Sequence, residues 1–322
     1  MSREHRESFV SLALSLFALV LLCSTARNAD AQAWVLPKGA GTISFMHQEL
    51  YNTGHRRIGG YLDEVGQSKN MALYVEAEYA FTDRLSVSAG IPYVFARVTA
   101  PNPPPFPIPR LPQDACHCWH ANWQDFGVTA RYNIFHGPFA LTPSVSFGVP
   151  SHDYQFRGEA VVGHDLKEVQ FSVDVGQRLD SISENLSLQG RYSYAVAERP
   201  IADIPNNRSN ARWEAAYQLT RKLSTYGFVS WQHTHGGLTF GSPKLSGALA
   251  WPGEVNTKEL LDQHDRIMRD NYWHVGGGAS YEFQHFDVFG SYTGYIAGTD
   301  THAGRAFTAG ISFPFELQLG NN

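Results

Sequence analysis

The chain has 322 residues, and 30 acidic side chains against 25 lysines and arginines give it a formal net charge of -5, which does not point to nucleic acid or an anionic membrane surface as a partner. Aromatic residues make up 13% of the chain, charged residues only 17%, and there are 29 glycines, a composition typical of a β-rich protein with many turns. A mean hydropathy of -0.28 excludes a bundle of transmembrane helices.

The N-terminus has the features of a secretory signal. A basic start is followed by the apolar run Val10–Leu22 and by an A-x-A cleavage motif, Ala29-Asp30-Ala31. This order predicts a signal peptide over residues 1–31 and a mature chain over residues 32–322 that leaves the cytosol.

Two other interpretations of this start fit the sequence less well. A lipoprotein anchored on Cys23 is disfavoured because Leu22 stands where a small residue is expected before the lipidated cysteine. A retained membrane helix is disfavoured because the apolar run is shorter than the roughly 20 residues that cross a bilayer.

Two neighbouring runs show the pattern that organises the mature chain. In Asn122–Phe135 and Phe139–Val149, apolar residues alternate with small or polar ones, which is the side-chain period of a strand with two unlike faces. The His136-Gly137-Pro138 break between them predicts a hairpin. Each run is close to the roughly 10 residues of a tilted strand that crosses a bilayer.

The same pattern recurs down the chain and predicts about twelve strands. They are expected at Gly41–Tyr51, Asn70–Thr82, Arg84–Val98, Asn122–Phe135, Phe139–Val149, Leu166–Leu179, Leu186–Val196, Ala211–Leu219, Leu223–His233, Asn271–Phe283, Phe286–Ala297 and Ala306–Leu317. Short connections between the strands alternate with long ones. The exception is the last connection on the long side, around Gly298–Gly304, which is also short. This wiring predicts an all-β, transmembrane, antiparallel up-and-down barrel with short periplasmic turns and long extracellular loops.

The faces of the predicted strands give a second test of this fold. Val169, Phe171 and Val173 alternate with polar residues, and a sheet that exposes an apolar face to lipid has to close on itself, because its backbone groups must all be bonded. A soluble lipocalin-like barrel or a sandwich would bury that face instead. The signal peptide, strand number and loop asymmetry favour the membrane barrel. Aromatic residues expected in its interfacial girdles are Trp123, Tyr132, Phe135, Trp213, Tyr217 and Trp273.

Two stretches resemble a known family. AWVLPKGAG (Ala33–Gly41), followed by a strand, and GPFALTPSVSFGVPSHDY (Gly137–Tyr154) are similar to the outer-membrane proteins of the MetA-pathway of phenol degradation family. The resemblance covers most of the mature chain in layout. It implies a transporter of small, often aromatic compounds in the Gram-negative outer membrane, with no catalytic signature.

One feature departs from the outer-membrane pattern. The outer-membrane assembly machinery is an expected partner, and it reads an aromatic final residue, whereas Phe313 and Phe315 are followed here by Glu316–Asn322. Recognition through the last residue is therefore not predicted.

Charged side chains of both signs fall on the inward parity of the predicted strands. The candidate lumen residues are Glu76, Glu78, Asp125, Arg131, Asp174, Arg178, Arg191, Arg212, Glu214, His274 and Glu282. A pore for sugar acids or phosphate is expected to be biased towards arginine and lysine. Mixed signs indicate either ion pairs that fill a narrow lumen or a polar pathway for small neutral or weakly charged solutes. The family resemblance implies that hydrophobic or aromatic compounds are among these solutes.

The second long loop ends in a cluster of thiols and imidazoles. Candidate ligands for Zn or Cu(I) are Cys116, His117, Cys118 and His120, which follow a proline-rich stretch at residues 101–112. Two cysteines in an oxidising compartment can instead pair with each other or between chains. The usual zinc spacing, with two or more residues between cysteines, is not met. The alternative function is therefore a closed barrel whose loops bind metal or a partner.

The last long loop carries two further features. His233, His235 and His264 could hold a metal, although such neighbours arise by chance in a chain with 14 histidines. Thr257–Arg269 predicts a short helix across the outer mouth, as a gate, a shield or an ordinary loop helix.

No catalytic site is predicted. Outer-membrane phospholipase chemistry needs a histidine and a serine two positions apart on a strand, and no His-x-Ser occurs. His152-Asp153 and His164-Asp165 supply acid and imidazole groups near the loops, but no pattern fixes their geometry. The chain also lacks a nucleotide-binding glycine motif.

Overall fold

The structure is a computed structural model that describes residues 33–57, 60, 62–63, 67–99, 116–156, 162–240, 249–250, 263 and 266–317. The predicted signal peptide, the proline-rich stretch at residues 101–112 and most of the predicted helix at residues 257–269, with His264, lie outside these residues. Among the described residues, no helix is long and apolar enough to cross a membrane.

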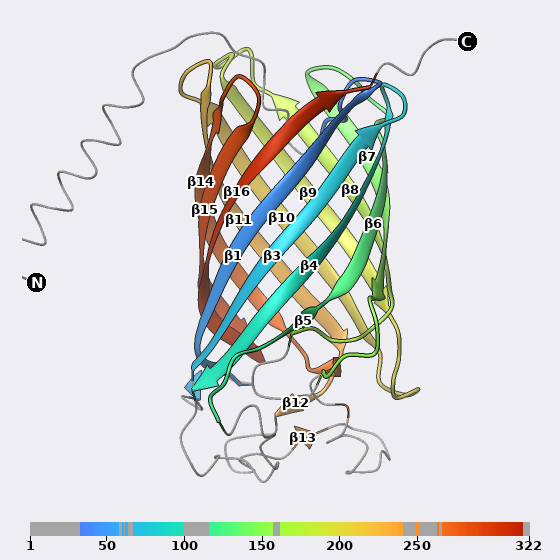
Figure 1. Cartoon of the computed structure of the whole chain (residues 1–322), viewed down its shortest axis with the longest axis vertical. Helices are drawn as coiled ribbons and strands as arrows, with labels where there is room; N and C mark the ends of the chain where they lie inside the picture. The colour runs from blue at the N-terminus through green and yellow to red at the C-terminus, as the bar shows by residue number, and fades with distance from the viewer. Residues whose placement is uncertain are drawn as a thin grey trace, which may run out of the picture.

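Twelve long antiparallel strands close into a barrel, as predicted (Figure 1). They are β1 (Ala40–Arg56), β3 (Gln67–Ala80), β4 (Leu85–Thr99), β6 (Asp125–Tyr132), β7 (Phe139–Pro150), β8 (Glu168–Arg178), β9 (Leu186–Ala197), β10 (Asn206–Gln218), β11 (Leu223–Gly236), β14 (Asn271–Glu282), β15 (Asp287–Thr299) and β16 (Thr301–Glu316). Each pairs with its neighbour in the chain, and β16 pairs with β1 along its whole length. The closure leaves the wall without a free edge.

Four short strands complete the description. They are β2 (Leu62–Asp63), β5 (His120–Trp123), β12 (Thr239–Phe240) and β13 (Leu249–Ala250). β2 pairs with the end of β1, β5 pairs with the outer half of β4, and β12 pairs with β13 outside the wall.

The run predicted as one strand at residues 122–135 is divided, which corrects the sequence analysis. β5 and β6 both pair with β4, and Gln124 separates them. The Gln124 backbone N–H donates to the carbonyl of Pro92 at 3.0 Å. A strand residue presents its N–H and C=O to the same neighbour, and proline has no N–H. The ladder therefore lacks its return bond at Pro92, and the strand is interrupted there.

The two ends of the barrel differ as the connection lengths predict. β1 begins and β16 ends at the end drawn uppermost in Figure 1, where short turns such as Phe81–Arg84 join the strands. We call this the turn end and the opposite one the loop end. The last connection at the loop end is shorter than predicted, since β15 and β16 extend until only Asp300 separates them.

The wall has an apolar outer face and a polar inner one. Large apolar side chains on the outward parity are solvent-exposed, among them Phe45, Leu73, Phe147, Phe171, Tyr292 and Phe307. The six predicted girdle aromatics, Trp123, Tyr132, Phe135, Trp213, Tyr217 and Trp273, are all exposed as well. A soluble barrel with an apolar interior is therefore excluded.

Buried apolar residues gather at the two ends of the barrel. Near the loop end, Tyr154 and Val162 pack on the inner face of β4 at Val94, Ala96 and Val98. A second cluster there joins Leu166, Ile201, Ile204, Leu238 and Ile267 from three connections. Near the turn end, Ala33 and Trp34 pack against Ala140 of β7.

Candidate functional site

The inner face carries ion pairs, and the first of them joins strands that are not neighbours in the sheet. Arg131 of β6 donates to Glu78 of β3 at 3.2 Å, across the intervening strand β4. Both side chains are largely buried, at 11% and 17% exposed. Only the concave side of the wall brings alternate strands this close, so the pair lies in the lumen.

A second pair joins β8 and β9. The Arg191 guanidinium donates to both carboxylate oxygens of Asp174, from Nε at 2.6 Å and from the terminal nitrogen at 2.8 Å. This two-point geometry is the strongest form of an arginine–carboxylate contact. The Asp174 side chain is 3% exposed and that of Arg191 is 31% exposed, so the arginine is the member that solutes in the lumen can reach.

A third group lies on β9, β10 and β11. Arg212 donates to Glu214 at 2.6 Å, and the Gln189 amide donates to the same carboxylate at 2.7 Å. The Arg212 guanidinium also stacks on the Phe228 ring, 3.6 Å from its centroid. We call the three pairs Glu78–Arg131, Asp174–Arg191 and Glu214–Arg212 the charged belt. Its charges are balanced.

The remaining predicted lumen residues lie outside the belt. Glu76 accepts from the Tyr74 hydroxyl at 3.5 Å, and His274 stacks on Tyr272 at 4.2 Å between ring centroids. Arg178 and Glu282 lie towards the turn end, away from the belt. Glu168 and Arg208, which are not among the predicted lumen residues, form a further ion pair towards the loop end.

Asp125 is held by a loop residue that covers it. The Tyr154 hydroxyl donates to the Asp125 carboxylate at 2.5 Å and accepts from the backbone N–H of Asp165 at 2.8 Å. Burial, followed by the contact with Asp125, raises the pKa of Tyr154, so its hydroxyl remains a donor at neutral pH. The loop is thereby fixed to the inner rim of the barrel.

The chain ahead of β1 turns back into the turn end of the lumen. Ala33, Trp34 and Val35 are at most 8% exposed, and we call them the strap. The Ala33 carbonyl accepts from the Thr142 hydroxyl at 2.6 Å and from the Asn133 amide at 3.3 Å.

Further contacts hold the strap across β6 to β9, where the Ala33 N–H donates to the Gln189 amide oxygen at 3.3 Å. The Trp34 carbonyl accepts from Arg131 at 3.2 Å, and the Trp34 indole N–H donates to the carbonyl of Gly137 at 2.8 Å. A Cβ added at Gly176 of β8 would lie 2.6 Å from both the Ala33 Cβ and the Trp34 ring. Glycine at this position therefore makes room for the strap.

Sequence reasoning missed the strap. Trp34-Val35-Leu36, directly ahead of the first strand, shows no alternation of apolar and polar residues that would assign it to a strand. The available signal was one of position, because three apolar residues just outside a membrane strand need something to cover them.

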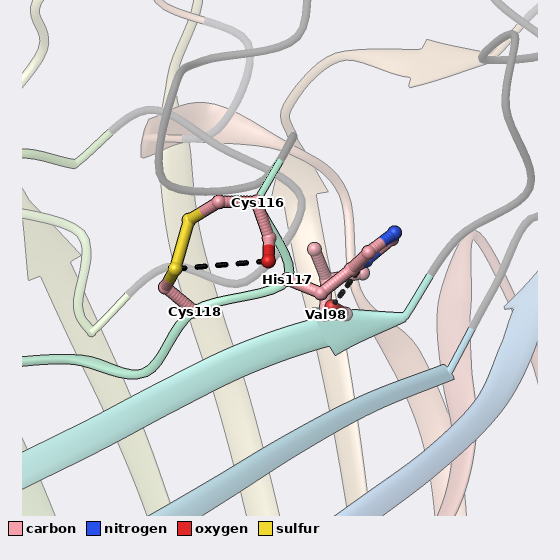
Figure 2. The surroundings of a disulfide bond; sticks show 4 residues. All are labelled: Val98, Cys116, His117 and Cys118. Carbon is pink, nitrogen blue, oxygen red and sulfur yellow. Dashed lines mark hydrogen bonds between the residues drawn. A yellow bond between two sulfur atoms is a disulfide. The ribbon is translucent and has the colours of Figure 1, made fainter.

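The cysteine and histidine cluster lies at the loop end, above β4. Cys116 and Cys118 form a disulfide, one of the alternatives left open by the sequence (Figure 2). His117 lies between them, and its Nδ1 is 3.1 Å from the backbone carbonyl of Val98, a contact drawn as a dashed line in Figure 2. His120 lies on β5, paired with Ala96. A bonded sulfur is not a thiolate, so metal binding at this cluster stays a prediction for its reduced form.

No protein-family model and no curated protein sequence matches this chain. Among solved structures, the fold is similar to that of the COG4313 outer membrane channel from Pseudomonas putida F1, with a TM-score of 0.65 and 12% identity over 90% of this chain and 100% of that one. The chain shares the fold of an outer-membrane channel. The comparison supports the outer-membrane barrel fold that the resemblance implied, but not membership of the phenol-degradation family.

Other similar structures fit less closely. They include the KdgM porin in complex with disordered oligogalacturonate, at a TM-score of 0.44 and 9% identity over 85% of this chain and 99% of that one. The translocator domain of the autotransporter NalP from Neisseria meningitidis has a TM-score of 0.45 and 10% identity over 97% and 96% of the two chains. At these scores they carry no argument about this chain.

The histidines of the last long loop lie apart from the lumen. His233 and His235 face outwards at the end of β11 with ring centroids 4.8 Å apart, and His235 shares a hydrogen bond of 2.8 Å with Ser209. Within the described ranges, no group of three or more histidine, cysteine, aspartate or glutamate side chains is arranged to hold a metal.

Proposed function

We propose that the protein is an outer-membrane channel for small solutes with little or no net charge. The turn end would face the periplasm and the loop end the exterior, as in barrels of this wiring. The observation that carries the proposal is the polar inner face of a closed wall whose outer face is apolar. Such a wall suits hydrocarbon outside and water inside.

The balanced belt supports the choice of solute. Each carboxylate in it is matched by an arginine within 3.2 Å, so the belt presents no excess charge of one sign. A belt of this kind does not concentrate ions of either sign strongly. Within this class, small hydrophobic and aromatic compounds are the proposed substrates, because the resemblance to the phenol-degradation family implies them.

Solute entry into vesicles tests the proposal. The mature protein, reconstituted into liposomes, is expected to admit small neutral aromatic alcohols faster than protein-free liposomes do, and to admit sugar acids of similar size more slowly. Stopped-flow light scattering measures both rates. The channel would be rejected if liposomes with protein, either wild type or Trp34→Ala, admitted every solute at the same rate as protein-free liposomes.

A second function is favoured by the occupied lumen. The strap enters from one end and the loop clusters from the other, so a barrel that stays closed would act through its loops. In that case the Cys116-His117-Cys118 cluster would bind Zn or Cu(I) after reduction. Two thiolates and an adjacent imidazole are suitable ligands for either ion.

Metal content separates the two functions. Protein reduced and loaded with Zn, then desalted, is expected to retain about one Zn per chain by mass spectrometry of the metal, as one cluster of ligands would hold. The Cys116→Ser/Cys118→Ser variant should retain none. His285→Ala, an exposed histidine in a turn at the other end, is the matched control. Equal Zn content in all three proteins would dispose of the metal site.

A further inference from the structure

Three cationic side chains form a row across the outside of the barrel. Tyr51 of β1 pairs with Arg305 of β16 on one side and with Lys69 of β3 on the other. Lys69 in turn pairs with Arg97 of β4. Arg305, Lys69 and Arg97 therefore follow one line across the wall, perpendicular to the tilted strands, and we call them the outer cation row. Neighbouring strands lie about 4.8 Å apart, so the row is roughly 14 Å wide.

The row faces away from the lumen. Arg305 lies two residues from Phe307, and Lys69 lies four residues from Leu73, on the same parity as these exposed apolar side chains. Arg97 shares the parity of Tyr93. The arginines of the charged belt, by contrast, all face inwards.

Aromatic and acidic neighbours hold the row in place. The Arg97 guanidinium lies over the Trp119 ring at 4.7 Å, and that of Arg305 lies over the Tyr51 ring at 5.4 Å. Stacking uses the face of a guanidinium and leaves its N–H edge free for an oxyanion. Lys69 Nζ is 3.0 Å from the Glu49 carboxylate, which offsets part of the lysine charge. The two arginines are therefore the stronger hydrogen-bond donors to a bound anion.

Aromatic residues near Arg97 show where this end of the row lies relative to the hydrocarbon of the membrane. Four residues from Arg97 towards the middle of the barrel, Tyr93 packs edge-on against the exposed Trp123 at 5.0 Å between ring centroids. Outward aromatics of this kind mark the boundary of the hydrocarbon, and charge on the lipid side is tolerated beyond it. Arg97, at the β4 end of the row, therefore lies where lipid headgroups would be, at the loop end.

We propose that the outer cation row binds the phosphate groups of a bisphosphorylated glycolipid in the outer leaflet. This inference rests on the proposed placement in the outer membrane, but not on solute passage. Arginine forks match phosphate oxygens in geometry and in charge. The width of the row lets one headgroup place its two phosphates on different members. The net charge of -5 makes this local positive row more selective, since the rest of the chain offers anions little attraction.

Lipid binding by the full mature protein tests this inference. The probe is fluorescent bisphosphorylated lipid A, titrated into purified protein in neutral detergent at moderate salt. The Arg305→Gln/Lys69→Gln/Arg97→Gln variant is expected to bind it about tenfold more weakly or worse, because three headgroup contacts lose their charge. Wild-type protein should bind the dephosphorylated glycolipid as weakly as the variant binds the probe.

A matched control keeps the result specific. Arg84→Gln/Arg221→Gln/Lys222→Gln removes three cations from turns at the opposite end and should bind as wild type does. Resistance to unfolding in detergent at room temperature, read from gel mobility with and without heating, shows that all three proteins are barrels. Equal affinity of the row variant and wild type, or equal affinity for phosphorylated and dephosphorylated lipid, would overturn the proposal. The row variant should retain solute entry in liposomes, so loss of lipid binding and failure of the channel are separate outcomes.

Discussion

Shortening Trp34 to alanine is expected to raise the single-channel conductance of the reconstituted protein several-fold. The Trp34 side chain lies inside the turn end of the lumen against β6 to β8, with its indole N–H bonded to Gly137 and its ring against Gly176. Truncating a buried tryptophan removes about 3 to 5 kcal/mol of packing. Each 1.4 kcal/mol changes a docked-to-released ratio tenfold, so the strap of the variant should spend most of its time outside the lumen.

A second variant approaches the same contact from the wall. Gly176→Ala places a methyl group 2.6 Å from the Ala33 Cβ, which the strap can avoid only by moving away. It should therefore raise the conductance in the same direction as Trp34→Ala. Planar-bilayer recording measures both variants at matched salt and voltage.

The control for this experiment is another tryptophan. Trp213 is 51% exposed on the outside of the wall, and Trp213→Ala should leave the conductance unchanged. If the two strap variants conduct no better than Trp213→Ala, the strap does not obstruct the lumen. The second function, a barrel acting through its loops, would then gain support only if solute entry in liposomes were also absent.

The strands could be predicted from sequence because a strand repeats every two residues. Alternation such as Val169, Phe171 and Val173 assigns every residue of β8 to a face, and the same reading put Asp174 and Arg191 on the inner side. Strand ends were less accurate, since β10, β11 and β16 extend beyond the apolar runs at the loop end. Polar residues there continue the ladder without continuing the apolar pattern.

Pairing within the lumen could not be predicted from parity. Glu78 and Arg131 fall on the inward parity of strands that do not touch, and their contact depends on the curvature of the wall. The interruption at Gln124 needed the register that places it opposite Pro92. The strap needed the register of four strands at once, because its neighbours Arg131, Thr142, Gly176 and Gln189 lie on β6, β7, β8 and β9.

Neutralising one member of the Asp174–Arg191 pair is expected to change the ion selectivity of the channel. Asp174→Asn leaves the Arg191 charge uncompensated in the lumen, so the preference for chloride over potassium should rise about threefold, since an unpaired charge attracts its counter-ion. Arg191→Gln leaves the carboxylate of Asp174 and should shift the preference towards potassium. The second shift should be smaller, because Asp174 is only 3% exposed whereas Arg191 is 31% exposed.

The double variant Asp174→Asn/Arg191→Gln separates charge from packing. It restores neutrality while keeping two side chains of similar size that can still form a hydrogen bond, so its selectivity should return close to that of wild type. Reversal potentials under a salt gradient measure the ion selectivity of the parent, the two single variants and the double variant. All four carry Trp34→Ala, so that the current is large enough to record. Glu184→Gln, an exposed turn residue away from the lumen wall, serves as the charge control. Single variants that shift selectivity in the same direction, or a double variant as selective as either, would show that the pair acts by shaping the lumen and not by balancing its charge.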